Sequence, residues 1–254
     1  MNIAARRFTW YYTRCQLRLK YRYTSLGFAW NFIEPALYLI ILSVIFSFVN
    51  RMNLSDYAVF LFGALLPWRY FERTVNSCMD SITGGDWLLK KMYVSPLALP
   101  LTRWLVASVE FLISLVVLFV ILLFLKQKWT IHLTVLPLSV IPWALLALGV
   151  GLISAVLFAF FRDIRPIVQL GLMLAFFASP ILFRPDLFPV VSIQARMLRF
   201  HPLTYFAALF QKPIYYGTWP SVLDWSISFA VAAFSLALGY GLLRKYRGVF
   251  YFYI

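Results

Sequence analysis

Charged residues are scarce in this 254-residue chain, and their scarcity limits what kind of protein it can be. Asp, Glu, Lys and Arg make up 13% of the residues, whereas a soluble domain carries about 25%. Hydrophobic residues make up 63%, and the mean hydropathy is +0.81. These values exclude an ordinary soluble domain, and they predict that the solvent of this chain is a lipid bilayer.

Acidic, histidine and cysteine residues are too few or too scattered for most site chemistry. No two of the nine carboxylates have a spacing that suggests acid–base catalysis or a divalent-metal site, and the two histidines are far apart in sequence. Cys15 and Cys78 are expected near the cytoplasmic side, where reducing conditions argue against a disulfide. The phosphate loop Gly-x-x-x-x-Gly-Lys-Ser/Thr is also missing. We therefore expect no metal, no cofactor and no catalytic residue, and we expect any ATP to be bound by a partner subunit.

Long apolar runs are what the chain has instead. A hydrocarbon core roughly 30 Å thick needs about 20 apolar residues per helix, and backbone that faces lipid must satisfy its own hydrogen bonds. The runs are continuous rather than alternating at period two, which favours helices over a barrel. We predict an all-α membrane protein with six transmembrane helices, at about 28–49, 57–82, 104–125, 136–161, 166–183 and 222–243.

Positive charge is distributed unevenly around these runs. The net charge of +14 could suggest nucleic acid, but in so apolar a chain the positive-inside rule explains it better. Fourteen Lys and Arg residues lie before the first span, after the sixth, and in the loops between spans 2 and 3 and between spans 4 and 5; the other three loops carry seven. We predict a multi-pass protein of the bacterial cytoplasmic membrane, with both termini in the cytoplasm and no nucleic-acid partner.

Residues 1–27 precede the membrane domain, which we place at 28–254. A helix over 3–24 would carry a basic stripe beside an apolar stripe. The basic stripe is Arg7, Arg14, Arg18 and Arg22, and the apolar stripe is Phe8, Tyr12, Cys15 and Leu19. This pattern predicts an amphipathic interface helix that contacts membrane lipid on the cytoplasmic leaflet. A basic topology signal with no further role is the alternative.

Two loops have more structure than a plain connection needs. Between spans 2 and 3, Gly84 and Gly85 break the helix, Asp86 can cap the next one, and 87–92 reads as a short amphipathic helix. This cytosolic helix is either a docking element or a solvated connector. Between spans 5 and 6, residues 184–220 are rich in Pro and aromatic residues, and we predict two short re-entrant helices that form a periplasmic gate.

Span 2 is exceptional because it carries Arg69, Glu72 and Arg73 at or below mid-depth. Arg69 and Glu72 are i, i+3 neighbours on a helix and can pair. Because charges inside a membrane are costly, they usually face a protein interior or an aqueous cavity. The cluster therefore indicates either a transport pathway or a structural ion pair that locks helices together.

Aromatic residues reach 19%, and many of the Trp residues fit interfacial belts. Others lie deep inside spans, and they are Tyr38, Tyr70, Phe71, Phe176 and Phe177. Aromatic faces with polar edges suit a channel that stacks against sugar rings. Ordinary helix packing is the alternative for each of them.

Several stretches, in their order along the chain, resemble the permease subunit of ABC-2-type polysaccharide exporters, which handle O-antigen, teichoic acid and capsule. The resemblance covers nearly the whole chain. It is carried by RLKYRYTSLGFAWNFIEPAL (18–37), FLFGALLPWRYFERTVNSCMDSI (60–82), LLKKMYVSPLALPLTR (88–103), FFRDIRPIVQLGLMLAFFASPILF (160–183) and HPLTYFAALFQKPIYYG (201–217).

The resemblance implies a homodimer that forms a continuous channel and is driven by two separate ABC ATPase subunits. It implies that Lys90, Lys91, Arg18 and Arg22 receive a lipid diphosphate headgroup at the cytosolic gate. It implies that spans 1, 2 and 5 line the channel, with the five deep aromatic residues as candidates. The Arg69, Glu72 and Arg73 cluster differs from the mostly neutral helix of the family, and it is a channel-lining candidate because of its own intramembrane charges. Coupling to the ATPase would involve Asp86, Trp87, Leu88, Arg162, Asp163 and Arg165.

The expected function is therefore the transport subunit of an exporter of a lipid-linked polysaccharide, with no enzymatic activity of its own. A periplasmic export component is a further expected partner. The nearest alternative is an ABC-2 exporter of a small hydrophobic molecule or drug. A membrane-embedded glycolipid enzyme is disfavoured because the chain lacks clustered acids, metal ligands and a nucleophile arrangement.

Overall fold

Regular structure in this protein is entirely helical wherever the computed structural model describes the chain. The long helices are α1 (Ile3–Tyr21), α2 (Trp30–Asn50), α3 (Leu54–Met79), α5 (Ala98–Phe124), α6 (Leu136–Phe160), α7 (Ile164–Ala178), α9 (Pro202–Gln211) and α10 (Val222–Tyr246). A π-helical segment, η5 (Lys212–Tyr216), continues α9. The described residues are 3–22, 27–50, 53–85, 88, 95–124, 130–184, 198 and 200–250.

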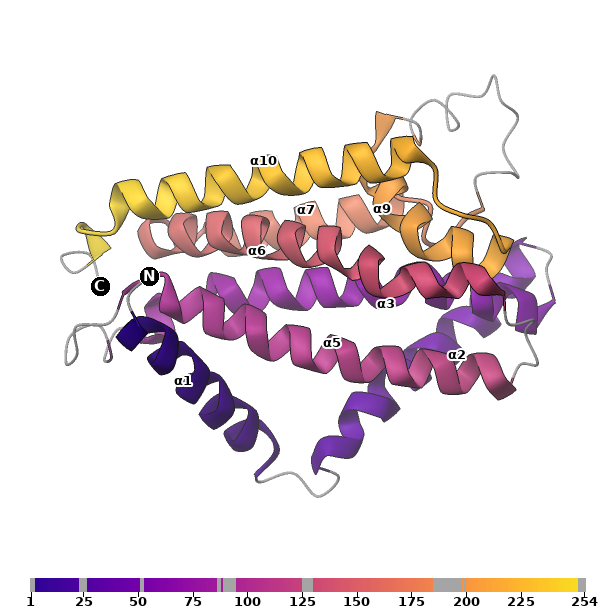
Figure 1. Cartoon of the computed structure of the whole chain (residues 1–254), viewed down its shortest axis with the longest axis horizontal. Coiled ribbons are helices and arrows are strands. Elements are labelled where there is room, and N and C mark those ends of the chain that lie inside the picture. The colour runs from indigo at the N-terminus through magenta and orange to yellow at the C-terminus, as the bar shows by residue number, and fades with distance from the viewer. Residues whose placement is uncertain are drawn as a thin grey trace.

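The helices form an elongated bundle (Figure 1). Helix α1 begins and α10 ends at one end of this bundle, and α9 lies toward the opposite end. Each of the six ranges predicted as a span coincides with one helix, namely α2, α3, α5, α6, α7 and α10. The predicted all-α class is therefore confirmed for the described chain.

Three segments are long and apolar enough to cross a membrane: Ala98–Val120, Ile131–Phe160 and Val222–Tyr246. Phe32–Phe48 and Ile164–Ala178 are apolar but shorter. Helix α3 has enough residues, but its second half carries charged side chains. The structure therefore supports a multi-pass membrane protein, and the count of six crossings stays a prediction.

Two helix boundaries differ from the predicted spans for reasons of proline chemistry. Helix α7 ends at Ala178 rather than near 183, because Ser179 precedes Pro180 and takes extended backbone, with φ −95° and ψ 156°. Helix α5 begins at Ala98 rather than near 104. Pro100 falls in its first turn, where the missing N–H breaks no intrahelical hydrogen bond.

Helix α3 is the centre of the molecule. Along its first half nearly every side chain is buried, including Tyr57, Phe60 and Phe62, and it packs against α5, α6 and α9. Helices α6 and α10 pack side by side through two glycines. A Cβ on Gly149 would lie 2.5 Å from the backbone N of Leu236, and a Cβ on Gly239 would lie 2.5 Å from the carbonyl O of Gly149. These backbones therefore approach each other as closely as glycine allows.

Polar side chains of the bundle hold α9 at its end. Trp143 Nε1 donates to the carbonyl of Phe206 at 3.1 Å, Ser139 Oγ to that of Leu209 at 3.0 Å, and Gln211 Nε2 to that of Pro180 at 2.8 Å. Helix α9 is thus one short buried helix within the predicted re-entrant region. Residues 185–197 and 199 of that region lie outside the described residues.

The N-terminal helix is amphipathic, but its two faces differ in part from the predicted stripes. Phe8 and Tyr12 pack against the core and stack on each other at 5.5 Å, whereas Cys15 and Leu19 are exposed. Helix α1 follows α5, since Arg103 Nη1 donates to Gln16 Oε1 at 3.2 Å. Helix α1 starts at one end of the bundle and runs obliquely to α5, so it does not lie across that end (Figure 1).

Candidate functional site

A row of alternating charges links four helices inside the bundle. It begins at Lys20 of α1, whose Nζ lies 2.5 Å from Glu110 Oε1 of α5. The other carboxylate oxygen of Glu110 is 3.3 Å from Nη1 of Arg73 on α3. Glu110 is the most deeply buried member, with its side chain 3% exposed. One buried carboxylate therefore joins α1, α5 and α3.

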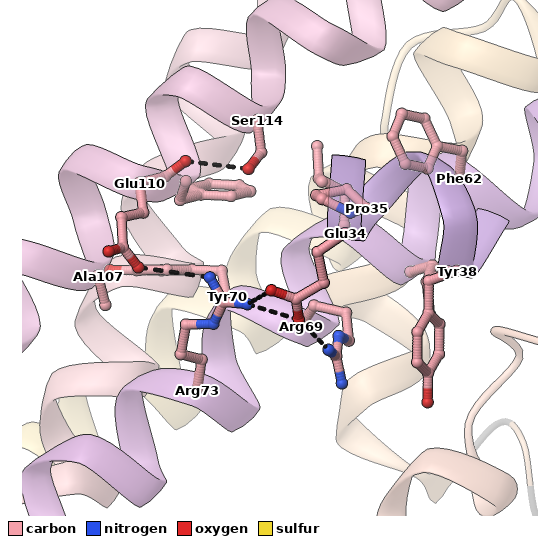
Figure 2. A pocket seen from close by; sticks show the side chains of 13 residues that line it. Glu34, Pro35, Tyr38, Phe62, Arg69, Tyr70, Arg73, Ala107, Glu110 and Ser114 are labelled. Carbon is pink, nitrogen blue, oxygen red and sulfur yellow. Dashed lines mark hydrogen bonds and ion pairs between the residues drawn. The ribbon is translucent and has the colours of Figure 1, made fainter. Parts of the chain in front are cut away.

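The row continues from Arg73 to α2 and back to α3. Arg73 Nη2 lies 2.8 Å from both carboxylate oxygens of Glu34, and Arg69 Nη2 lies 2.7 Å from Oε1 of the same residue. Arg69 Nη1 then reaches Glu72 Oε2 at 3.3 Å. Figure 2 shows Arg73 between Glu110 and Glu34, with Arg69 on the far side of Glu34. The six residues carry three positive and three negative charges, so the charge network is neutral as a whole.

Helix geometry explains why α3 supplies half of this network. Residues at i, i+3 and i+4 share one face of an α-helix, so Arg69, Glu72 and Arg73 all point to the same side. A short exposed ion pair contributes little, but a linked network with a buried member holds helices in one arrangement. The expected Arg69–Glu72 pair is present as part of a larger network, and the choice between a transport pathway and a structural lock stays a prediction.

The same face of α3 opens into a recess of about 210 Å³ between α2, α3 and α7. Its charged members are Arg69 and Glu72, and its remaining lining is largely apolar and aromatic: Tyr38, Leu65, Trp68, Leu172, Met173, Phe176 and Phe177. The Arg69 guanidinium lies over the Tyr38 ring, 4.4 Å from its centroid. Aromatic faces next to a guanidinium and a carboxylate can stack on a sugar ring and bond its hydroxyls.

Tyr70 and Phe71 do not line this recess, although they were expected beside the other channel residues. Tyr70 instead lines a neighbouring pocket with Glu34, Arg69 and Arg73 (Figure 2). Tyr70 stacks on Phe111 at 4.5 Å and shares a 2.8 Å hydrogen bond with Ser108 Oγ. Phe71 packs edge-on against Trp143 at 6.1 Å. Both side chains are buried. Neither contributes to the recess, and their place in a channel lining stays a prediction.

Three of the residues predicted to couple to an ATPase, Arg162, Asp163 and Arg165, lie at the α6–α7 connection. Arg162 and Asp163 are exposed in the turn between α6 and α7. Arg165 forms an ion pair with Asp80, the residue that ends α3, and its guanidinium lies 4.8 Å above the Phe158 ring. This pair ties the α6–α7 turn to the start of the loop between α3 and α5.

The predicted cytosolic gate helix falls almost wholly outside the described residues, and so do Asp86, Trp87, Lys90 and Lys91. Leu88 is described and is buried in a small cluster with Leu99 and Leu152. The other two residues expected to meet a lipid headgroup, Arg18 and Arg22, are exposed on α1. No cluster of His, Cys, Asp and Glu able to hold a metal ion occurs in the described ranges.

Sequence reasoning missed three members of the charge network. They are Glu34, Glu110 and Lys20, and none of them was assigned a role from the sequence. The signal was present, because a carboxylate in an apolar run demands a counter-charge. Arg69 and Arg73 were the cations predicted inside the spans, so they were the available counter-charges. Only the packing of the helices shows which of these two cations pairs with Glu34 and which pairs with Glu110.

Comparison with known proteins places this geometry in a family. No family model matches the chain. The O-antigen export system permease protein RfbA of Klebsiella pneumoniae is 31% identical over 183 residues, covering 70% of this chain and 69% of the relative. RfbA of Myxococcus xanthus is 29% identical over 223 residues, covering 88% and 85%. The polysialic acid transport protein KpsM of Escherichia coli is 24% identical over 210 residues, covering 80% and 79%.

The chain therefore belongs to the family of ABC-2-type permeases of O-antigen and polysaccharide exporters. This result confirms the resemblance identified from the sequence stretches. It also fits the helices that are long and apolar enough to cross a membrane.

Proposed function

We propose that this chain is the permease subunit of an ATP-driven exporter that carries a lipid-linked polysaccharide across the cytoplasmic membrane. The observation that carries the proposal is the recess between α2, α3 and α7. It combines aromatic rings with a guanidinium and a carboxylate in a chain whose relatives are O-antigen and polysialic acid export proteins. Of the predicted lining, Tyr38, Phe176 and Phe177 with Arg69 and Glu72 stay in this role.

A homodimer would turn this open recess into an enclosed channel. Helix α7 has one buried residue, Leu172, and exposes Ile167, Leu170 and Leu174. Helix α2 likewise exposes several large apolar side chains: Ile40, Ile41, Val44, Ile45 and Phe48. Helices α2 and α7 therefore border the recess and expose large apolar side chains, against which a second copy of the chain would pack. That copy would complete the pathway and shield it from lipid.

Energy would come from two ABC ATPase subunits that dock where α1 begins. The exposed α6–α7 turn and the loop after Asp80 would receive them, and both termini would lie on the same cytoplasmic side. Lys90 and Lys91 would meet the diphosphate of the incoming lipid, because charge-assisted hydrogen bonds to phosphate are strong. A periplasmic component would accept the polysaccharide at the α9 end.

The proposal is tested by reconstituting the permease with its ATPase in proteoliposomes and measuring ATP hydrolysis with and without polyprenyl-linked glycans. We expect glycan to stimulate hydrolysis, and we expect Lys90→Ala with Lys91→Ala to weaken this stimulation. The matched control is Lys126→Ala with Lys128→Ala, a lysine pair predicted on the opposite membrane face, which should leave it unchanged. Stimulation by hydrophobic drugs but by no glycan would indicate the alternative substrate class instead.

The Asp80–Arg165 ion pair gives a separate prediction about coupling. Both side chains are more than two-fifths exposed, so removing either should change folding stability by less than about 1 kcal/mol. Asp80→Ala should nevertheless reduce glycan-stimulated hydrolysis by roughly 2- to 30-fold, the usual range for residues that couple two sites. Arg165→Ala should have a similar effect, and the double variant should be no worse than either single variant. Additive losses in the double variant would show that the two residues act independently.

A further inference from the structure

A basic groove outside the charge network separates the N-terminal half of α1 from the start of α5. We define the α1–α5 groove by its lining residues Arg6, Arg7, Thr9, Trp10, Tyr11, Arg14, Leu101 and Leu105. Its volume is about 850 Å³ and it is open to the surroundings. None of these residues is acidic, and no ion pair joins Arg6, Arg7 or Arg14 to a carboxylate of the described chain.

The three exposed arginines contrast with the cations of the charge network, which are each paired with a carboxylate. Lys20, Arg69 and Arg73 each contact a carboxylate within 3.3 Å. Arg14 instead lies over the Trp10 ring, with its guanidinium carbon 4.8 Å from the centroid. This cation–π contact holds the guanidinium in place without neutralising its charge. The groove therefore presents an uncompensated positive charge beside an aromatic surface.

The opposite wall of the groove is apolar. Leu101 and Leu105 of α5 are partly exposed there, one helical turn apart. Trp10 is 52% exposed and Tyr11 is 65% exposed, which is unusual for rings this large unless they meet a membrane interface or a ligand. A ligand that fits both walls must have an anionic head and a hydrocarbon body.

We propose that the α1–α5 groove is a binding site for an anionic membrane phospholipid. The phosphate of the headgroup would bond to the guanidinium groups of Arg6, Arg7 and Arg14, and an acyl chain would lie along Leu101 and Leu105. The site lies at the bundle end where α1 begins, the predicted level of the cytoplasmic headgroups (Figure 1). Its lining does not include Arg18 or Arg22, two of the predicted contacts of the exported lipid. The proposal rests on the membrane location of the chain and not on the identity of its substrate.

Native mass spectrometry of the full-length chain in detergent tests this site with phosphatidylglycerol as the probe. We expect saturable binding of phosphatidylglycerol, and no binding above background of phosphatidylcholine with the same acyl chains. Arg6→Gln, Arg7→Gln and Arg14→Gln combined should weaken phosphatidylglycerol binding about tenfold or more. Replacing the same three residues with lysine should retain most of the affinity, which also guards against loss through misfolding.

The matched control removes three exposed cations at the same end of the molecule, through Arg244→Gln, Lys245→Gln and Arg247→Gln on and after α10. It lowers the net charge equally but should leave the saturable binding unchanged. Equal losses in both triple variants would mean non-specific attraction and would overturn the proposal. So would displacement of phosphatidylglycerol by a stoichiometric amount of polyprenyl diphosphate, or by the ATPase subunit on assembly.

Discussion

Replacing Gly239 with leucine is expected to separate α6 from α10 and to lower the apparent Tm of the detergent-solubilised protein by about 6–12 °C. The first new carbon would already meet the Gly149 carbonyl at 2.5 Å and Leu152 Cβ at 2.9 Å. A backbone atom cannot rotate away, so the two helices must move apart along their contact. Overpacking costs about 1–3 kcal/mol or more, and roughly 3 kcal/mol corresponds to that shift in a domain of this size.

Gly241→Leu is the matched control, because it makes the same chemical change two residues further along the same helix. A Cβ at Gly241 meets nothing within 4 Å. Leucine favours helix over glycine by up to about 1 kcal/mol, so this variant should melt at the same temperature or slightly higher. Equal destabilisation by both substitutions would show that the α6–α10 contact is not the cause.

Glu110→Gln is expected to have the second large effect, because it leaves Lys20 and Arg73 with one negative charge too few. Glu110 is nearly fully buried and bonds to both cations, at 2.5 Å and 3.3 Å. Removing one partner from a fully buried ion pair costs about 3–5 kcal/mol. Because Lys20 is 46% exposed and Arg73 keeps Glu34 as a partner, we expect a smaller loss of about 1–3 kcal/mol. Thermal unfolding of the purified protein measures the loss.

A compensating variant distinguishes charge balance from simple loss of contact. Lys20→Met combined with Glu110→Gln removes one charge of each sign, so the remaining network of Arg73, Glu34, Arg69 and Glu72 is neutral again. This double variant should be more stable than Glu110→Gln alone. Glu72→Gln, at the exposed end of the row, should cost less than about 1 kcal/mol. A double variant that is less stable than Glu110→Gln would contradict the charge-balance argument.

Much of the fold could be predicted because hydrophobic run length is a property of the sequence alone. All six predicted spans coincide with helices, and most boundaries agree within a few residues. The exceptions arise where local chemistry overrides hydropathy, as when Pro180 stops α7 although the apolar residues continue to Phe183. The close approach of α6 and α10 was not predicted, because a glycine in an apolar run does not reveal which helix it faces.

The candidate site could be predicted only in part. Arg69, Glu72 and Arg73 were found because the i, i+3 and i+4 rule acts within one helix. Glu34 and Glu110 come from other helices, and only tertiary packing brings them within 3.3 Å of Arg73. For the aromatic residues deep inside the spans, the sequence did not show which ones line the recess and which ones pack in the core. Phe177 lines the recess whereas Tyr70 points into the core, and composition does not distinguish the two.

Pro67 lies inside α3, directly before the face that carries the charge network. Proline has no N–H, so the carbonyl of Gly63 lacks its partner within the helix, and the hydrogen-bond ladder of α3 is interrupted at this point. Helix α3 packs against α9, and the segment after Pro67 runs through Arg69 and Arg73 to Asp80. Pro67 is therefore the point where α3 bends most easily, and a bend there would change the angle of the Arg69–Arg73 segment relative to the first half of the helix.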